Sequence, residues 1–398
     1  MTPSPLPVVR LKPKANARAI RFGAPWVYDN EVVTDRRTRK ITPGMICILE
    51  DADRAPLGLV AVNPNSRIFA RVLERDTQVT IDRAWLTSKL RAALNLREKL
   101  YAAPFYRLVH AEGDGVPGVV IDRFGDTAVV QPNAAWAELL LPDLVAALEE
   151  VTGVAHVLKN AAGRARGLEG LDDQSVVLAG QAPAEPVEVS MNGATYLADL
   201  VDGQKTGLFY DQRPNHAFAA QAAKGARVLD VFSHVGGFGL AALANGAEHA
   251  LAVDGSAAAL ALAEGGAKRM GQGDRFATRQ GDAFEVLGQL AKEGARFDLV
   301  ICDPPAFAPN KQALEAGLRA YERVARLAAP LVSEGGILGL CSCSHAADLT
   351  KFRSASVRGI GRAGRRAALI HTGFAGPDHP QHPHLAETAY LKALFFRL

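Results

Sequence analysis

The sequence RVLDVFSHVGGFGLAALA, residues 227–244, places a glycine-rich loop between two apolar runs. Arg227–Val231 has the length and composition of a buried strand, and Leu240–Ala244 is predicted to lie in a helix that starts directly after the glycines. Glycine allows a backbone to approach a ligand closely, and the unpaired amides at a helix start attract electronegative groups. The stretch therefore predicts a strand, loop and helix that bind a nucleotide-like ligand, with a tight structural turn as the alternative.

The same alternation of short apolar runs and helical stretches continues to the C-terminus. Further strands are predicted at Ala250–Val253, Phe276–Arg279, Leu299–Cys302, Gly336–Leu340, Ala367–His371 and Ala389–Phe396. Such alternation predicts a mostly parallel sheet with helices on both faces. Ligands bind beyond the carboxyl ends of strands in such sheets, so the residues after each run are the candidates for chemistry.

Two cofactors fit the glycine loop, a nicotinamide dinucleotide and S-adenosylmethionine. Gly237–Ala242 matches the dinucleotide pattern of a nicotinamide enzyme, and Asp254 after the second strand suits a ribose hydroxyl with either cofactor. Asp282 follows the third strand, where it would bond an adenine amino group or serve as a helix N-cap.

Asp303-Pro304-Pro305 follows the fourth strand. Consecutive prolines fix the backbone and hold the preceding carboxylate at the mouth of the site. Loops of this type occur in S-adenosylmethionine-dependent enzymes that act on a planar nitrogen or a ring carbon, and nicotinamide enzymes do not need them. Enzymes that methylate amino groups usually have an aromatic residue after the prolines, whereas Ala306 stands here, which disfavours an amino group as the target.

Cys341-Ser342-Cys343-Ser344 follows the fifth strand, and a helix is predicted to begin near His345 with Asp348 in its first turn. A thiol between a strand end and a helix N-terminus gains thiolate character and suits a nucleophile. A thiolate that adds to carbon-6 of a pyrimidine makes carbon-5 reactive toward a methyl donor, and Asp303 would stabilise this adduct through ring N3. The alternative is that Cys341 and Cys343 are ordinary small residues of the core. A zinc site is disfavoured, because a single C-x-C motif lacks a second pair of ligands.

Two other kinds of segment carry polar character. The strip Val201–Arg213 lies just before the first strand, where it would close over a cofactor or pack as an extension on the sheet. Residues 1–40 contain nine Lys or Arg and three Asp or Glu, a balance of +6, and Lys351–Leu369 has six basic residues and no acid. Phosphate binding would explain both biases, and solvated basic faces are the alternative. The candidate RNA contacts are Arg10, Lys12, Lys14, Arg18, Arg21, Arg365 and Arg366.

Length and composition limit the class of protein. A chain of 398 residues predicts two or three domains, and 48% hydrophobic with 22% charged residues is ordinary globular composition. The net charge of +3 alone does not indicate a nucleic-acid partner. Four cysteines are too few for a disulfide framework, and neither a signal peptide nor a long apolar segment is present, so we expect a cytoplasmic protein without membrane insertion.

Short β-rich segments (Val8–Leu11, Met45–Glu50, Leu57–Val62, Ile68–Leu73) predict a first domain at 1–75. The helix predicted at 81–101 and a β meander predict an α/β domain at 76–195, followed by a third domain at 196–398.

Taken together, these motifs resemble the RlmI-like family of large-subunit (23S) ribosomal RNA 5-methylcytosine methyltransferases over nearly the whole chain. The resemblance rests on Lys205-Thr206-Gly207 with Asp211-Gln212-Arg213, Phe232-Ser233 with Gly236-Gly237-Phe238, Asp303-Pro304-Pro305, Ser342-Cys343-Ser344, Glu112–Gly118 with Asp122–Gly125, and Asp378-His379-Pro380 with Tyr390-Leu391-Lys392. It implies an N-terminal PUA-like RNA-binding domain, a central α/β domain and a C-terminal Rossmann-like class I methyltransferase sheet. It also implies Cys343 as nucleophile, assisted by Asp303, with Cys341 as a bystander.

The cofactor expected from this resemblance is S-adenosyl-L-methionine. Its predicted binding residues are Lys205, Phe209, Arg213, Asp230, Phe232, Gly236, Gly237, Asp254, Asp282, Asp303 and Pro304. Three rival hypotheses stay open at this point: a guanine-modifying rRNA methyltransferase in which Cys343 is structural, a nicotinamide-dependent oxidoreductase, and an RNA chaperone that binds the cofactor without turnover. The sequence also leaves open whether the protein forms a homodimer.

Overall fold

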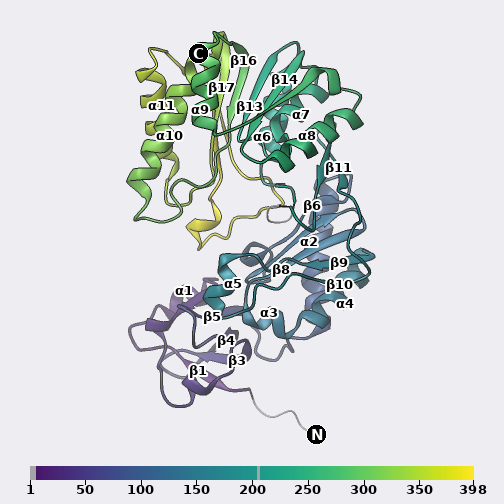
Figure 1. Cartoon of the computed structure of the whole chain (residues 1–398). Helices are drawn as coiled ribbons and strands as arrows, with labels where there is room; N and C mark the ends of the chain where they lie inside the picture. Colours follow the sequence, from purple (N-terminus) through teal and green to yellow (C-terminus); the bar gives the residue numbers. More distant parts are fainter. Residues whose placement is uncertain (1–5, 204–206) are drawn as a thin grey trace. The chain divides into compact units, whose positions relative to one another are not determined.

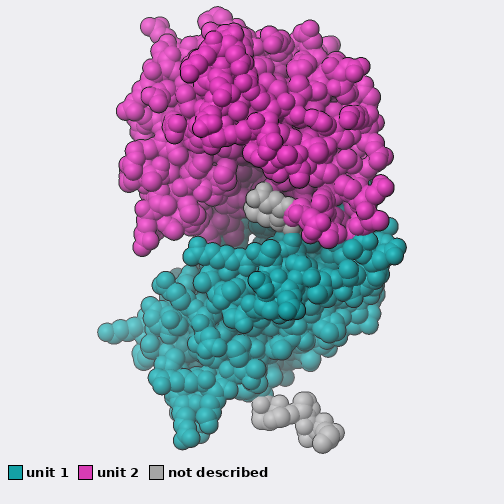
Figure 2. Space-filling model, in the orientation of Figure 1, with its two compact units in different colours: residues 1–182, 378–385 teal, residues 183–377, 386–398 magenta. Residues whose placement is uncertain are grey.

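The computed structural model describes residues 6–203 and 207–398. Contacts divide the chain into two compact units, which Figure 2 shows in teal and magenta. Unit 1 consists of residues 1–182 and 378–385, and unit 2 of residues 183–377 and 386–398. Within the described ranges, no helix is both long and apolar enough to cross a membrane. The domain boundaries predicted at residues 75 and 195 stay predictions.

The first sheet of unit 1 has the strand order β1-β3-β4-β5-β2. Its strands are Val8–Arg10 (β1), Trp26–Tyr28 (β2), Met45–Glu50 (β3), Pro56–Val62 (β4) and Ile68–Glu74 (β5), accompanied by the helix Ala17–Arg21 (α1) and the short 3-10 turns Asp29–Glu31 and Thr38–Lys40. Alternate residues of β3, Cys47 and Leu49, are buried in the core of this sheet, as the period-2 pattern requires. The four predicted strands are confirmed, and β2, a further strand of three residues, was not predicted.

The second sheet of unit 1 has the order β10-β9-β8-β7-β6. Its elements are Arg83–Leu100 (α2), Phe105–His110 (β6), Val119–Phe124 (β7), Thr127–Pro132 (β8), Ala135–Leu139 (α3), Leu141–Thr152 (α4), His156–Lys159 (β9), Arg164–Glu169 (α5) and Val176–Ala179 (β10), with a 3-10 turn at Ala111–Asp114. Asp82 caps α2 by accepting a hydrogen bond from the amide of Trp85 at 3.0 Å. The predicted helix at 81–101 and the antiparallel meander β6-β7-β8 are both confirmed.

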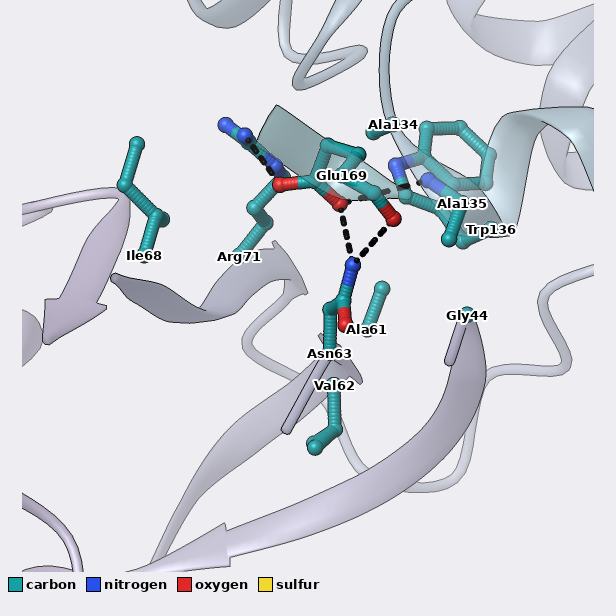
Figure 3. A pocket seen from close by; sticks show the side chains of 10 residues that line it. All are labelled: Gly44, Ala61, Val62, Asn63, Ile68, Arg71, Ala134, Ala135, Trp136 and Glu169. Atoms are coloured by element: carbon teal, nitrogen blue, oxygen red, sulfur yellow. Dashed lines mark hydrogen bonds and ion pairs between the residues drawn. The ribbon is translucent and has the colours of Figure 1, made fainter. Parts of the chain in front are cut away.

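A buried polar network joins the two sheets of unit 1 (Figure 3). Asn63 Nδ2, after β4, donates to Glu169 O at 3.0 Å and to Glu169 Oε2 at 2.9 Å. Arg71 on β5 pairs with Glu169 at 3.0 Å and with Glu112 at 3.2 Å. Asn63, Arg71 and Glu169 line a small pocket together with apolar residues such as Ala61 and Trp136. The partners satisfy one another, so the network is a structural joint between the sheets.

A segment from near the C-terminus also belongs to unit 1. Asp378 is fully buried, and it accepts a hydrogen bond from Arg97 Nη2 through its backbone oxygen at 3.1 Å and one from the amide of Arg107 through Oδ2 at 3.2 Å. The ring of His379 lies 4.9 Å from that of His110. Buried polar contacts therefore hold this segment to residues that lie 271 and 281 positions earlier in the chain.

Unit 2 is built on a seven-stranded sheet of order β15-β14-β13-β16-β17-β19-β18. Its strands are Arg227–Val231 (β13), His249–Asp254 (β14), Phe276–Gln280 (β15), Phe297–Cys302 (β16), Val332–Ser342 (β17), Ala368–Gly373 (β18) and Lys392–Arg397 (β19). Strands β13 to β17 pair in parallel, whereas β19 pairs antiparallel with both β17 and β18. A separate hairpin of Val187–Met191 (β11) and Ala194–Ala198 (β12) precedes the sheet.

Helices cover both faces of this sheet, as predicted (Figure 1). Arg213–Gln221 (α6), Gly237–Ala244 (α7) and Ala257–Arg269 (α8) lie on one side, and Ala283–Lys292 (α9), Leu314–Ala328 (α10) and Leu349–Arg362 (α11) on the other. Short 3-10 turns lie at Gly273–Arg275, Ala329–Leu331 and Ala386–Thr388. The core between the sheet and α9 to α11 is mainly aliphatic, with Leu229, Val300 and Leu338 fully buried.

Three predicted boundaries near the candidate site are wrong. The fifth strand of the sheet, β17, runs to Ser342 and not to Leu340, so Cys341 lies within the strand and not after it. The helix after Cys343 begins at Leu349 with Asp348 as its N-cap, and not near His345, because the Asp348 side chain accepts the amide hydrogen of Lys351. The last strand begins at Lys392 and not at Ala389, because pairing with β17 starts where Ser342 ends that strand.

Candidate active site

The glycine loop after β13 has an unusual backbone. Phe232, His234 and Gly236 have positive φ values of 61°, 50° and 83°, a region that residues with a side chain rarely adopt. Such conformations persist only where the surroundings enforce them, and they concentrate at functional sites. Gly237 begins α7, and a Cβ there would lie 2.7 Å from His216 Nε2, so this position has no room for a side chain.

Asp230 lies buried beneath this loop. Its Oδ2 accepts hydrogen bonds from the amides of Phe238 at 3.1 Å and Gly239 at 2.8 Å. Its Oδ1 has no hydrogen-bond partner among the described residues, which is costly for a buried carboxylate. Burial raises the pKa of Asp230 to about 7, against the two amides that lower it. An orphan carboxylate oxygen at the glycine loop suits a cationic group of a bound ligand.

The acidic residues at the ends of the next two strands, Asp254 and Asp282, accept hydrogen bonds from backbone amides. Asp254 accepts the amides of His234 and Ser256, each at 2.9 Å, so it holds the glycine loop as well as its own turn. Asp282 caps α9 through Oδ1, which accepts the amides of Phe284 at 3.0 Å and Glu285 at 3.1 Å. The N-cap alternative for Asp282 is thus observed, and an adenine contact stays a prediction.

Three phenylalanines gather at the carboxyl ends of β13, β15 and β16. The ring of Phe232 lies 6.4 Å from both Phe284 and Phe307, and those two rings are 6.1 Å apart. All three side chains are partly exposed, and the guanidinium of Arg323 lies 4.5 Å from the centre of the Phe284 ring. Partly exposed rings beside a glycine loop form an apolar surface on which a planar heterocycle can stack.

The Asp-Pro-Pro loop lies next to the cysteine turn. The amide of Asp303 donates to Val231 O at 3.1 Å, which joins the ends of β13 and β16. Further along, the amide of Ala308 donates to Ser344 Oγ at 2.9 Å, and Tyr321 OH lies 2.7 Å from the same oxygen. Ser344 is fully buried, so it anchors the loop that carries Asp303 and Pro304 to the turn that carries Cys343.

The four cysteines differ in access to solvent. Cys47, Cys302 and Cys341 are buried, whereas Cys343 is partly exposed. Burial raises the pKa of the Cys341 thiol well above its ordinary value, so that side chain is an inert core group. Cys343 lies directly after β17 and is separated from α11 by residues 344–348. The helix start is therefore farther along the chain from the thiol than the sequence predicted.

The segment before α6 approaches the glycine loop with its aromatic side chains. The ring of Phe209 lies 5.1 Å from that of His234, and the guanidinium of Arg213 lies 5.6 Å from the centre of the Tyr210 ring. Gln212 is buried, and its Nε2 has no hydrogen-bond partner in the part of the chain that the structure describes. Lys205 lies outside the described residues. Phe209 thus lies beside the glycine loop, and its closure over the cofactor stays a prediction.

The basic residues predicted to bind RNA fall into two groups. Arg10 pairs with Glu50 at 2.8 Å, Arg21 pairs with Asp51, and Lys12 Nζ donates to Asn30 O at 2.9 Å, so part of their charge is engaged locally. Arg365 donates to Val332 O at 2.8 Å and also contacts Ala329 O, which gives it a structural role. By contrast, three exposed cations make no ion pair within the described ranges: Lys14, Arg18 and Arg366.

Two residues that sequence analysis did not single out complete the site. Tyr321 on α10 bonds Ser344, and its aromatic position in an amphipathic helix gave no sign of this contact. Lys392 was quoted only as part of a tail motif, yet its Nζ donates to Ser344 O at 2.7 Å. A single lysine inside the apolar run Ala389–Phe396 was the available signal, because a charge in a buried strand requires a partner.

Comparisons with known proteins match nearly the whole chain. Residues 143–397 match the family of S-adenosylmethionine-dependent methyltransferases, and residues 9–75 match a PUA-like domain. A protein of Deinococcus radiodurans named ribosomal RNA large subunit methyltransferase is 34% identical over 99% of this chain and 98% of its own length. Ribosomal RNA large subunit methyltransferase I of Aliivibrio fischeri is 34% identical over 97% of this chain and 98% of its own. This chain belongs to the RlmI-like family of S-adenosylmethionine-dependent methyltransferases.

A solved structure supports the same fold for this methyltransferase. SMU.776, a putative methyltransferase complexed with SAH, is similar with a TM-score of 0.82 at 19% identity, and the match covers 99% of this chain and 100% of that one. Family membership confirms S-adenosylmethionine as the cofactor, so the nicotinamide alternative drawn from Gly237–Ala242 is wrong. The predicted combination of a PUA-like β domain with an α/β methyltransferase sheet is confirmed as well.

The described residues fit this cofactor. S-adenosylmethionine carries an ammonium group, a ribose and an adenine, and the site offers an orphan carboxylate oxygen at Asp230, a second carboxylate at Asp254 and the partly exposed ring of Phe284.

Proposed function

We propose that this protein methylates carbon-5 of a cytosine in 23S large-subunit ribosomal RNA, through a transient bond between Cys343 Sγ and carbon-6 of the base. The names of the relatives support ribosomal RNA as the substrate. The observation that carries the covalent step is the contrast among the cysteines: Cys343 alone of the four is not buried. It follows β17, next to the strand whose end carries Asp303.

The chemistry assigns one task to each group. The Cys343 thiolate forms a bond to carbon-6, and the electron pair of the C5=C6 double bond moves into the ring toward N3, where Asp303 holds the balancing proton. Carbon-5 thereby becomes nucleophilic. Carbon-5 would then use that pair for its bond to the methyl group, and N3 would return its proton to Asp303. When a base removes the carbon-5 proton, the electrons of the broken C5–H bond form the C5=C6 bond, and the C6–S bond breaks so that Cys343 leaves as a thiolate. A target inside a stacked helix must first be extruded to expose carbon-6.

S-adenosylmethionine, when bound, supplies the electrophilic methyl group. In this proposal Asp230 binds its ammonium group, Gly236 and Gly237 allow close backbone approach, and Asp254 binds the ribose. The remaining predicted contacts border the adenine or close over the methionine part: Lys205, Phe209, Arg213, Phe232, Asp282, Asp303 and Pro304.

The PUA-like domain is proposed to hold the RNA. Lys14 and Arg18 are exposed on it, and the Arg18 guanidinium lies 5.3 Å from the centre of the ring of Phe22, itself 63% exposed. A cation beside an exposed aromatic ring offers both a phosphate contact and a stacking surface.

A trapping experiment tests the proposal directly. The protein is incubated with S-adenosylmethionine and ribosomal RNA that contains 5-fluorocytosine, and the products are analysed by mass spectrometry. Fluorine cannot leave carbon-5 as a proton does, so the wild type should accumulate a protein–RNA adduct on the peptide with Cys343.

Matched variants complete the test. Cys343→Ala should form no adduct and lose at least roughly a thousand-fold in methyl transfer, as expected when a nucleophile is removed. Cys341→Ala, two residues away, should keep both. If methyl transfer to normal RNA occurs without an adduct in any of these proteins, and the modified nucleoside is a methylguanine, the guanine-modifying alternative replaces this proposal.

A further inference from the structure

A buried lysine lies against the turn that carries Cys343. Lys392 begins β19 and has 4% of its surface exposed. In the antiparallel register with β17 it is the partner of Ser342, the residue directly before Cys343. Its Nζ donates to Ser344 O at 2.7 Å and to Ala347 O at 2.8 Å. Lys392 therefore holds the turn at both ends.

The two carbonyls do not balance the charge of this lysine. An ammonium group has three N–H donors, and among the described residues two of them are used by Ser344 and Ala347. A buried cation without a charged partner is expensive, and the groups that bear on it electrostatically are Cys343 and Asp348. Asp348 lies at the surface, where it pairs with Lys351. Cys343 lies between Ser342, the register partner of Lys392, and Ser344, whose carbonyl Lys392 binds, so the charge of Lys392 is close to the turn that carries the thiol.

We propose that Lys392 is a positioning residue for Cys343: its ammonium group fixes the turn through two backbone carbonyls and stabilises the thiolate form of the thiol. The inference rests on the proposed function, in which that thiolate is the nucleophile. From the sequence, the N-terminus of the following helix was expected to stabilise the thiolate. In this proposal a lysine on β19 does so. Because α11 begins only at Leu349 and is capped by the carboxylate of Asp348, its dipole is a poor source of positive charge at Cys343.

The charges around the turn define the expected pH dependence. Burial lowers the pKa of Lys392 to about 8, while Cys343 and Asp348 raise it, so the ammonium form predominates at pH 7. Hydrogen bonds from Lys351 lower the pKa of Asp348, which is therefore ionised at pH 7. Burial raises the pKa of Tyr321, which is neutral there. Lys392 is accordingly the cation that controls the thiol near neutral pH.

Alkylation of the thiol measures its ionisation without any turnover. The full-length protein is treated with iodoacetamide between pH 5 and pH 10, and the rate at Cys343 is followed by peptide mass spectrometry, with fragment spectra to separate it from Cys341. The wild-type midpoint should lie below about 8.5, the ordinary value for a thiol. In Lys392→Met, a chain of similar length without charge, the midpoint should rise by at least about one pH unit, which is about tenfold in rate at pH 7.

Controls separate charge from structure. Lys392→Arg should keep the low midpoint, and Lys292→Met, an exposed lysine at the end of α9, should leave it unchanged. An unchanged midpoint in folded Lys392→Met would overturn the proposal. If that variant does not fold, the wild type still decides, since a midpoint at or above about 8.5 is also incompatible with the proposal.

The proposed function can fail separately. Should Cys343→Ser retain methyl transfer while Lys392 still controls alkylation, the covalent mechanism is wrong and the lysine–thiol coupling stands. Should Cys343→Ser lose transfer while Lys392→Met leaves the midpoint in place, the nucleophile stands and the role of Lys392 is wrong.

Discussion

The amide of Ala308 donates a hydrogen bond of 2.9 Å to Ser344 Oγ, and both residues are completely buried. Through this bond the loop that starts with Asp303 and the turn that holds Cys343 become one rigid edge of the sheet. A nucleophile and an acid that act on one ring must keep a fixed separation, since small displacements cost large factors in rate. In the proposed mechanism, Ser344 is therefore a positioning residue that does not touch the substrate.

Replacement of this serine tests the connection. Ser344→Ala leaves the buried amide of Ala308 without its acceptor, which should cost about 1–3 kcal/mol of unfolding free energy and lower the rate of methyl transfer. Chemical denaturation and a radiolabelled methyl-transfer assay measure the two effects. Tyr321→Phe removes only the hydroxyl partner of Ser344 and should have the smaller effect on both. An equal or larger loss with Tyr321→Phe would contradict this account.

Cofactor binding should depend on pH through Asp230. Because burial raises its pKa to about 7, the carboxyl is largely protonated at pH 6 and ionised at pH 8. If the ammonium group of S-adenosylmethionine binds there, its affinity in calorimetric titration should rise between these two pH values. Asp230→Asn should bind more weakly at pH 8 and lose that rise. If the affinity of the variant and that of the wild type rise equally with pH, the ammonium group binds elsewhere.

The same residue predicts a trend in stability without cofactor. A pKa raised in the folded state means that the folded protein holds this proton more tightly than the unfolded chain does. The contribution of Asp230 to the unfolding free energy should therefore fall as pH rises from about 4 to about 7 and stay constant above. Urea denaturation of wild type and Asp230→Asn across this range isolates it, because the variant lacks that contribution. A parallel pH dependence in both proteins would contradict the assignment.

The glycine at the start of α7 should resist the smallest substitution. In Gly237→Ala the new Cβ would lie 2.7 Å from His216 Nε2, so the loop or the imidazole must move, and we expect the affinity for S-adenosylmethionine to drop by about tenfold or more. Gly288→Ala on α9 is the matched control. No atom lies within 4 Å of its Cβ position, and alanine in a helix should stabilise the protein by about 0.5–1 kcal/mol. Normal binding by Gly237→Ala would show that the loop tolerates displacement.

The basic residues should separate into RNA contacts and structural groups. Lys14→Ala and Arg18→Ala should weaken RNA binding and reduce its salt dependence by about one unit of slope per contact, without a change in melting temperature. Arg365→Ala should instead lower the melting temperature, because Arg365 donates to the carbonyls of Ala329 and Val332. Filter binding at several salt concentrations and thermal denaturation distinguish the two. If only Arg365→Ala loses affinity for RNA, then Arg365 is the RNA contact, and Lys14 and Arg18 are not.

Local sequence predicted the elements of both units well, because their patterns are determined by near neighbours. Arg227–Val231 and Met45–Glu50 are strands with the predicted bounds, and α2 follows its apolar spacing. One error concerns a local cap that was assigned to the wrong position, and another lies where a tertiary contact decides. The start of α11 is set by the cap at Asp348, and the start of β19 by pairing with the end of β17.

The candidate site was predicted residue by residue but not as a set of contacts. The motifs indicated Cys343, Asp303, Asp230 and the glycine loop, since their chemistry is visible in residue type and position. Ser344 accepts hydrogen bonds from Ala308 and from the buried Lys392, which lie 36 and 48 positions away in the sequence. Sequence periodicity does not predict contacts over such separations. The distinction between Arg365 and Lys14 likewise depends on which carbonyls and acids lie nearby in space.

The placement of residues 378–385 within unit 1 affects how this protein can be made. During synthesis on the ribosome, the buried partner of Arg97 and Arg107 is translated after nearly all of unit 2, so unit 1 completes its contacts only at the end of translation. A fragment cut at residue 182 lacks Asp378, so Arg97 would lose the backbone oxygen that accepts from its Nη2 and would keep the carboxylate of Asp114. The two units are therefore compact in space but interleaved in the gene, and neither can be expressed whole as one uninterrupted piece of the chain.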